Sequence, residues 1–254
     1  MEEIVKSEIK NLVNSKIEQK LNEYASESDY KPFFEAIFDK QTIIIASIMQ
    51  SLYTSFGMSI YEQMAVILAR NAGYTATHQY DLTGRVDNQT ESLITRICAD
   101  LSRNADKKAE VEMIRQSIQR GTPPFDADAD KRVDVFMVKP DGEELYIDIT
   151  TVKPSLKEFR VLKRKILRWC ALRFSLDPTV RIRTCIGIPY NPYYPEPYKR
   201  WTASGCDLKE DLLIQNELWR EFTGYDVFPE LIELFEEIGL ELREKVSIFL
   251  RDRR

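Results

Sequence analysis

Histidine and cysteine are scarce in this sequence. Among 254 residues there are one histidine, His78, and four cysteines, which stand far apart with no CxxC pair. Zinc sites of the HExxH, deaminase and zinc-knuckle kinds need ligands that such a sequence does not offer. The same spacing argues against a disulfide framework and predicts reduced thiols. Any chemistry must therefore come from carboxylates, lysines or hydroxyls.

Long apolar runs and glycine-rich phosphate loops are also missing. The most apolar segment, Ile43 to Met49, is too short to cross a bilayer, and the acidic start Met1-Glu2-Glu3 does not resemble a signal peptide. Neither GxGxxG nor GxxxxGK[S/T] occurs, which excludes the usual dinucleotide and P-loop sites. We therefore expect a cytoplasmic protein that has no membrane partner.

Charge is distributed unevenly along a chain whose net charge is −5. Residues 1–149 carry a net charge of −8, residues 150–200 carry +9, and residues 201–254 carry −6. A local basic block in an acidic body can hold a polyanion while the protein stays soluble. A merely solvated basic helix is the alternative interpretation of this block.

Apolar periodicity predicts helices in the outer parts of the chain and strands between them. Helices are predicted over residues 2–24, 32–54, 59–71, 88–120, 156–173 and 208–245, and strands over 132–138, 144–150 and 180–188. We expect the helix pair at 32–54 to be buried, Gly57 to break the helical pattern, and Ser59 with Glu62 to form a capping box. Gly224 and Gly239 are expected to interrupt the last helical segment. The pattern predicts one α/β domain with helical additions.

The first two predicted strands form a hairpin around Lys139-Pro140-Asp141-Gly142, which is typical of a tight turn. Positions that pair across this hairpin have numbers that sum to about 281–282, so Asp134 and Asp148 lie opposite each other on one face. Two carboxylates there repel at a cost of roughly 1 kcal/mol unless a cation lies between them. Mg²⁺ takes oxygen ligands and would remove that cost. An edge hairpin with both aspartates in water is the alternative.

An acidic strand, a turn, a second acidic strand and a following helix resemble the core of the PD-(D/E)xK nucleases. In this resemblance Asp134 matches the first acid and Asp148 the second, while Thr150 stands where the family pattern has lysine. Glu62, on the predicted helix 59–71, takes the position of an extra acid that many such nucleases carry on an early helix.

Longer segments are similar to the TdeIII-type restriction endonucleases. They are Asp148 to Ser155, the basic helix that ends near Trp169, Ile188 to Trp201, and Phe228 to Arg243. The resemblance implies an α/β core with a central mixed sheet flanked by helices. It implies one endonuclease domain over residues 1–254, with a helical N-terminal extension at 1–54, a catalytic core at 55–201 and a helical C-terminal region at 202–254.

The resemblance also implies a function. Such enzymes are prokaryotic type II endonucleases that use Mg²⁺ to cut both strands of a short, near-palindromic DNA site, and members are associated with GGNCC. Cutting a symmetric site implies a homodimer, and a restriction-modification system implies a cognate DNA methyltransferase that acts without direct contact. Asp134, Asp148, the Ile149 carbonyl and Glu62 would hold the metal. The same three acids together with Thr150 form the expected catalytic set.

Thr150 is the point where this chain departs from the family pattern. A lysine there would orient the attacking water and stabilise charge on the phosphate, which threonine does poorly. Strand alternation puts Lys153 on the opposite face, so it is a poor substitute. Either another group supplies the missing role, or the enzyme is weakened or inactive. A catalytically silent DNA-binding protein with a nuclease fold is the alternative, and a third hypothesis is an interaction protein whose basic helix binds an acidic partner.

Basic side chains that follow the second strand are the predicted DNA contacts. On the helix at 156–173, an apolar stripe through Leu162 and Ile166 is expected to pack on the sheet, and its arginines fall on another face. That face would meet phosphates without reading sequence. Residues 189–201, rich in proline and tyrosine, are either a groove contact or a structural strap. The expected DNA contacts are Lys153, Lys157, Arg160, Lys163, Arg164, Arg168, Lys199 and Arg200.

Overall fold

The computed structural model describes residues 1–22, 31–100, 105–118, 130–150, 152–199 and 205–251. These residues form two compact units, one made of Met1–Ile67 with Val227–Arg254 and the other of Leu68–Asp226. The helical N-terminal and C-terminal regions predicted from the sequence both contribute to the first unit. None of the helices in the described ranges has an apolar stretch long enough to span a membrane.

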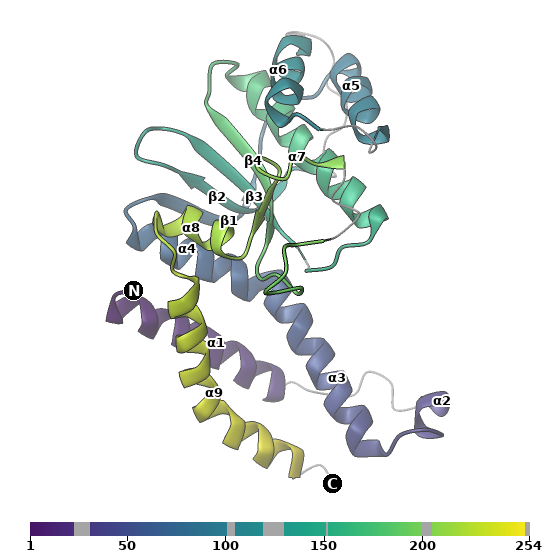
Figure 1. The fold of residues 1–254 in the computed structure, drawn as a ribbon, viewed down its shortest axis with the longest axis vertical. Helices are drawn as coiled ribbons and strands as arrows, with labels where there is room; N and C mark the ends of the chain where they lie inside the picture. Colours follow the sequence, from purple (N-terminus) through teal and green to yellow (C-terminus); the bar gives the residue numbers. More distant parts are fainter. Residues whose placement is uncertain (23–30, 101–104, 119–129, 151, 200–204, 252–254) are drawn as a thin grey trace. The chain divides into compact units, whose positions relative to one another are not determined.

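The first unit is helical. Within it, α1 packs against α9 and α3 (Figure 1). Val5, Ile9 and Val13 are buried at intervals of four residues along α1, which is the spacing of one helix face. The elements of this unit are α1 (Glu3–Asn22), α2 (Pro32–Glu35), α3 (Lys40–Ser55), the π-helical turn η1 (Phe56–Ile60), the start of α4 (Tyr61–Asn71), and α9 (Phe228–Arg251).

The helices around Gly57 differ from the prediction in two ways. First, α3, η1 and α4 follow one another without a break, so Gly57 lies in a π-helical turn and Ser59 is not an N-cap. A capping residue needs non-helical backbone angles, which a residue inside a continuous helix cannot adopt. Second, the segment is not buried, because Ile48 is the buried residue of α3 while Phe33 is 83% exposed.

The second unit contains, in its described part, a five-stranded sheet in the order β1-β2-β3-β4-β5. The first three strands pair antiparallel, and β3, β4 and β5 pair parallel. The predicted hairpin and the predicted third strand are β2, β3 and β4, so the predicted mixed sheet is confirmed. The strands are β1 (Thr75–Asp81), β2 (Arg132–Val138), β3 (Glu144–Ile149), β4 (Ile182–Ile188) and β5 (Leu212–Ile214).

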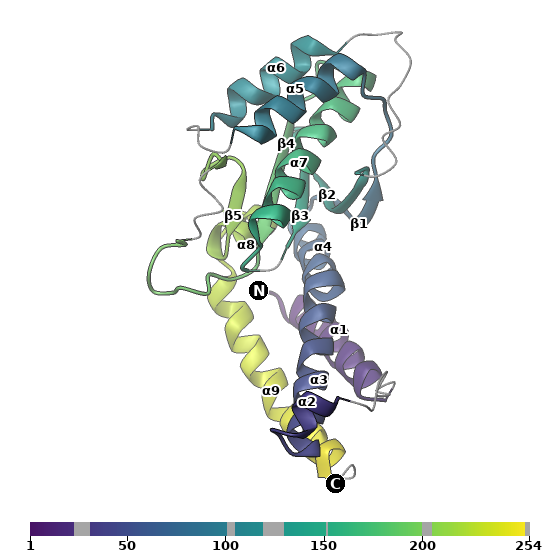
Figure 2. The ribbon, with the colours of Figure 1, turned by 90° about the vertical axis from the view of Figure 1, so that its right-hand side faces the viewer.

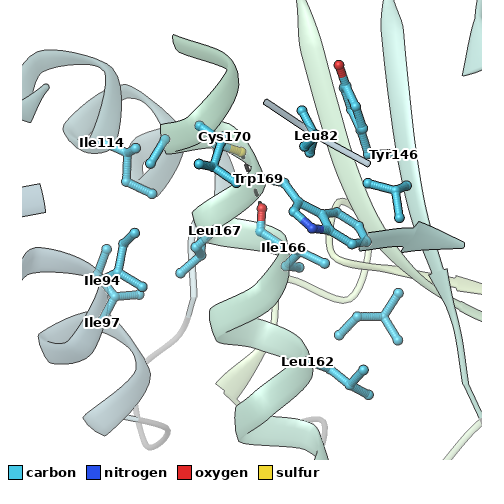
Figure 3. Close-up of a cluster of buried hydrophobic side chains, with 14 of the residues drawn as sticks. Leu82, Ile94, Ile97, Ile114, Tyr146, Leu162, Ile166, Leu167, Trp169 and Cys170 are labelled. Carbon is cyan, nitrogen blue, oxygen red and sulfur yellow. Dashed lines mark hydrogen bonds between the residues drawn. The ribbon is translucent and has the colours of Figure 1, made fainter. Parts of the chain in front are cut away.

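Helix α7 (Leu156–Leu176) lies across the sheet and is itself covered by α5 (Asn88–Ala99) and α6 (Lys107–Ser117) (Figures 1 and 2). It begins at a capping box formed by Ser155 and Glu158. Figure 3 shows Trp169 beside Tyr146 of the sheet on one side of α7, and Ile114 on the other side. Because α7 is packed on two sides, little of its surface remains for solvent.

The C-terminal helical segment is divided at Gly224 as predicted, but not at Gly239. Helix α8 (Asn216–Thr223) ends at Gly224, whose φ of 79° is a left-handed conformation that glycine adopts without strain. Gly239 lies inside α9.

Candidate active site

The two aspartates of the hairpin lie at opposing positions. The pairs Val135 with Ile147 and Val138 with Glu144 give position numbers that sum to 282, so Asp134 and Asp148 follow as the next pair on the same face. The backbone N–H of Ile149 donates to Asp134 Oδ2 at 2.8 Å, which fixes this carboxylate beside β3. The predicted register is therefore confirmed.

Asp148 is buried in the middle of the sheet. Its strand β3 pairs with both β2 and β4, and 4% of the residue is exposed. The alternative of an edge hairpin with both aspartates in water is therefore wrong. Burial raises the pKa of the Asp148 carboxyl above its usual range, and the neighbouring Lys165 opposes that rise.

Lys165 of α7 forms an ion pair with Asp148 Oδ2, a contact that the sequence analysis did not anticipate. Its ammonium also lies 5.2 Å from the centroid of the Trp169 ring. Burial alone would lower the pKa of Lys165, but the charges of Asp148 and Asp134 outweigh it, so the pKa lies above its usual value. In this structure the carboxylate pair and one ammonium therefore share a largely buried site.

The remaining predicted site residues are placed as follows. In an extended strand the N–H and C=O of one residue point toward the same neighbouring strand, so the Ile149 carbonyl is directed to the side of Asp134. Thr150 is half-buried just after β3, and its N–H donates to the Gly187 carbonyl at 3.0 Å. Glu62 is buried in the first turn of α4 and belongs to the other unit, so its part in the site stays a prediction.

The donor set fits a hard divalent cation. Among the residues that the structure describes, no group of three or more His, Cys, Asp or Glu side chains could hold a metal. Mg²⁺, however, is usually held by one or two carboxylates, with waters and substrate phosphates as its other ligands. Asp134, Asp148 and the Ile149 carbonyl present only oxygen. The buried Asp148 Oδ2 is balanced by the Lys165 ammonium that contacts it.

Two of the predicted DNA contacts are buried, so the prediction that they lie on an exposed basic face is wrong. Lys163 is 1% exposed and pairs with Glu110, and Arg168 is 3% exposed and pairs with Asp130 at 2.6 Å. The physical reason is the position of α7 beneath α5 and α6. An uncompensated charge is costly there, so each buried cation pairs with an acid of a neighbouring segment.

The other predicted DNA contacts lie on the surface to different degrees. Lys153, Lys157 and Arg160 are exposed where β3 gives way to α7, near the end of β3 that carries Asp148. The side chain of Arg164 is 43% exposed and pairs with Glu91.

The last two predicted contacts follow β4. Lys199 is exposed and pairs with Glu196 at 2.7 Å. Arg200 lies outside the described residues.

A second set of charges, which we call the buried ion cluster, was missed by the sequence analysis. It consists of Lys107, Glu110, Lys163 and Asp211. Asp211 is fully buried and pairs with both lysines, with Lys107 Nζ at 2.8 Å from its Oδ1. Lys107, at the start of α6, is itself only 5% exposed. This cluster joins α6, α7 and the segment before β5.

A mixed sheet crossed by a helix, with opposed carboxylates at its centre, defines a restriction-endonuclease-like α/β fold. The family model of HinfI, a type II restriction endonuclease, matches residues 1–239, and the chain belongs to this family. The TdeIII-type assignment that the sequence suggested is not confirmed. The coarser prediction, a type II site-specific deoxyribonuclease, is confirmed.

Named relatives agree with the family. The type II restriction enzymes HgiCII and HgiBI of Herpetosiphon aurantiacus are each 22% identical to this chain, over 275 and 273 residues. Each alignment covers 96% of this chain, and they cover 97% and 96% of the two relatives. The type II restriction enzyme MjaII of Methanocaldococcus jannaschii is 24% identical over 203 residues, which are 74% of this chain and 53% of that enzyme.

Proposed function

We propose that this enzyme makes Mg²⁺-dependent double-strand cuts at a short, near-palindromic DNA site, and that Asp134 and Asp148 hold the metal. The observation that carries the proposal is the opposed pair itself, with Asp148 buried in the central strand and the Ile149 N–H fixing Asp134. GGNCC is the site that the sequence resemblance suggests. Such an enzyme needs a cognate DNA methyltransferase that protects the host site, acting without direct contact.

The residues of the site have separate roles in this mechanism. A divalent cation, when bound, would supply a lowered water pKa and would stabilise negative charge on the phosphate. Asp134 and Asp148, with the Ile149 carbonyl, would hold it. Exposed Lys153, Lys157 and Arg160, with Lys199 and Arg200 further along the chain, would bind the flanking phosphates and hold the duplex in register.

Digestion of long duplex DNA tests this function. With Mg²⁺ we expect discrete fragments whose ends map to one short sequence, and with a chelator we expect none. A catalytically silent DNA-binding protein would instead bind duplex in a salt-sensitive manner and give no product with any divalent ion. Random ends would contradict the proposed sequence specificity.

We further propose that the active form is a homodimer whose two copies meet through apolar side chains around α2 and α3. One chain carries one Asp134–Asp148 pair, whereas cutting both strands of a symmetric site calls for two such pairs related by a two-fold axis. An exposed apolar patch of this kind is typical of an interaction surface. The patch, which we call the α2–α3 surface, consists of Phe33, Phe34, Ile37, Phe38, Ile45, Met49 and Tyr53.

The α2–α3 surface makes a prediction about mass in solution. Wild-type protein should sediment at twice the chain mass of 29.7 kDa, and an Ile37→Asp variant should sediment as a single chain. Ile37 is 73% exposed, so the substitution should not disturb folding. On supercoiled plasmid this variant should lose the linear product of double-strand cutting. Ile4→Asp, at a 64% exposed position of α1, is the matched control. An unchanged mass for Ile37→Asp would place the interface elsewhere.

A further inference from the structure

The ammonium of Lys165 lies against Asp148, the second acid of the proposed metal site. It reaches from α7 to Asp148 Oδ2, and its side chain is 19% exposed. A lysine two residues after the second acid, as in the family pattern, would lie on the same face of the strand as that acid. Lys165 approaches that same face from the helix that covers it. The two routes thus bring an ammonium to the same carboxylate.

We propose that Lys165 is a catalytic residue. It performs the role of the lysine that the family pattern has at the position occupied by Thr150 in this chain. The inference rests on the proposed function. In phosphodiester hydrolysis a water oxygen bonds to phosphorus, and the bond from phosphorus to one deoxyribose oxygen breaks. The water gives up a proton, and the leaving oxygen takes one up. The Lys165 ammonium orients that water and stabilises negative charge on the phosphate.

Lys153 and Lys163, the lysines on either side of Lys157 in the sequence, make contacts other than with Asp148. Lys153 is exposed, and its Nζ lies 5.3 Å from the centroid of the Tyr193 ring. Lys163 is enclosed in the buried ion cluster. Lys165 is held by two features, the ion pair to Asp148 and the face of Trp169. The indole N–H of Trp169 donates in turn to the Asp130 carbonyl at 2.8 Å, which fixes the ring beneath the ammonium.

A simpler role for Lys165 is that of a counter-ion that only balances Asp148 while no metal is bound. The two roles predict different results for the full chain with Mg²⁺. A counter-ion is dispensable once a divalent cation neutralises the carboxylates, whereas a catalytic lysine is still needed. A simple counter-ion also has no reason to be replaceable by a lysine at position 150.

The test compares wild type, Lys165→Met, Lys165→Met with Thr150→Lys, and the control Lys108→Met. Lys108 is exposed on α6, and its pair with Glu210 lies on the surface. Single-turnover cleavage of a cognate duplex at saturating Mg²⁺ is measured beside duplex binding in Ca²⁺ and thermal midpoints with and without metal. We expect Lys165→Met to lose about 100-fold or more in cleavage rate. We expect it to bind duplex within about threefold of wild type. Lys165 is proposed to act at the scissile phosphate, whereas overall DNA affinity comes from contacts to many backbone phosphates.

The rescue variant carries the most weight. The double variant with Lys165→Met and Thr150→Lys should cleave about tenfold faster or more than Lys165→Met alone. In the double variant an ammonium again lies on the same face of the strand as Asp148. Lys108→Met should cleave like wild type. If Lys165→Met does not fold, Lys165→Gln, which is polar and similar in length, should show the same loss.

Two results would overturn the inference, and they are distinguishable. If wild type cuts and Lys165→Met cuts within about threefold of it, with only the metal-free thermal midpoint lowered, Lys165 is a counter-ion. If wild type itself gives no product with Mg²⁺, the proposed function fails and the assignment of Lys165 fails with it.

Discussion

Asp134→Asn is expected to lower the rate of DNA cleavage by about a thousandfold or more. A bound divalent cation contributes several kcal/mol to the stabilisation of charge in the transition state, and each 1.36 kcal/mol is a factor of ten in rate. An asparagine oxygen is a weaker ligand for Mg²⁺, but it can still accept the hydrogen bond from the Ile149 N–H. The variant should therefore fold and fail at the metal. The measurements are single-turnover cleavage and calorimetric titration with Mg²⁺.

A matched control is available on the neighbouring strand. Asp81 lies on the edge strand β1 and pairs with Arg132, with 50% of its side chain exposed. Asp81→Asn removes the same charge from the same sheet and should change neither metal binding nor cleavage by more than about twofold, since exposed ion pairs contribute little. Wild-type cleavage by Asp134→Asn would contradict the proposed metal site. Equal losses in the two variants would show an effect of sheet charge rather than of ligation.

The central hairpin could be predicted from the sequence because its signals are local. The turn Lys139-Pro140-Asp141-Gly142 sets the register, and the register places Asp134 opposite Asp148. Strand β1 was missed because its residues, Thr-Ala-Thr-His-Gln-Tyr-Asp, show no alternation of apolar side chains. Strand β5 was missed because three residues are too few to outweigh the helical pattern around them.

The surroundings of α7 could not be predicted, because they depend on contacts distant in sequence. A period of 3.6 residues separates faces of a helix, but it does not reveal whether the polar face meets water or another helix. Lys163 and Arg168 therefore looked exposed although α5 and α6 cover them. One signal for Lys165 was present, since it lies four residues before Trp169 and three after Leu162, at the edge of the apolar stripe. A lysine at that position reaches toward the sheet.

Asp211→Asn is expected to destabilise the protein by about 3–5 kcal/mol, the largest effect on stability that we predict for a single change outside the hydrophobic core. Asp211 is fully buried and pairs with Lys107 and Lys163. An amide would leave the buried ion cluster with two ammonium groups and the single carboxylate of Glu110. Removing one member of such a cluster leaves a buried charge uncompensated. This destabilises the protein more than replacing the whole cluster with well-packed apolar residues would. Urea unfolding at pH 7 measures the difference.

The dependence on pH separates a lost charge from lost packing. The two lysines hold the pKa of the Asp211 carboxyl below its usual range in spite of burial. A carboxyl with a depressed folded-state pKa stabilises the protein above its unfolded pKa, about 3.9, and loses that contribution as pH falls through the folded value. The difference between wild type and Asp211→Asn should therefore be constant near neutral pH and shrink below about pH 4.

Glu210→Gln provides the comparison that decides whether burial is the cause. Glu210 precedes Asp211 in the chain, with 28% of its side chain exposed. It pairs with Lys108, whose side chain is 81% exposed, and lies 3.8 Å from Arg183 Nε. A surface pair of this kind contributes about 0–1 kcal/mol, so Glu210→Gln should unfold close to wild type. If both substitutions cost the same, the pairs of Asp211 stabilise no more than a surface contact, and the packing of α6 and α7 must depend on their apolar residues alone. If Asp211→Asn costs several times more, the buried ion cluster couples α6 and α7 to the segment before β5. Any substitution within the cluster should then destabilise the packing of all three segments.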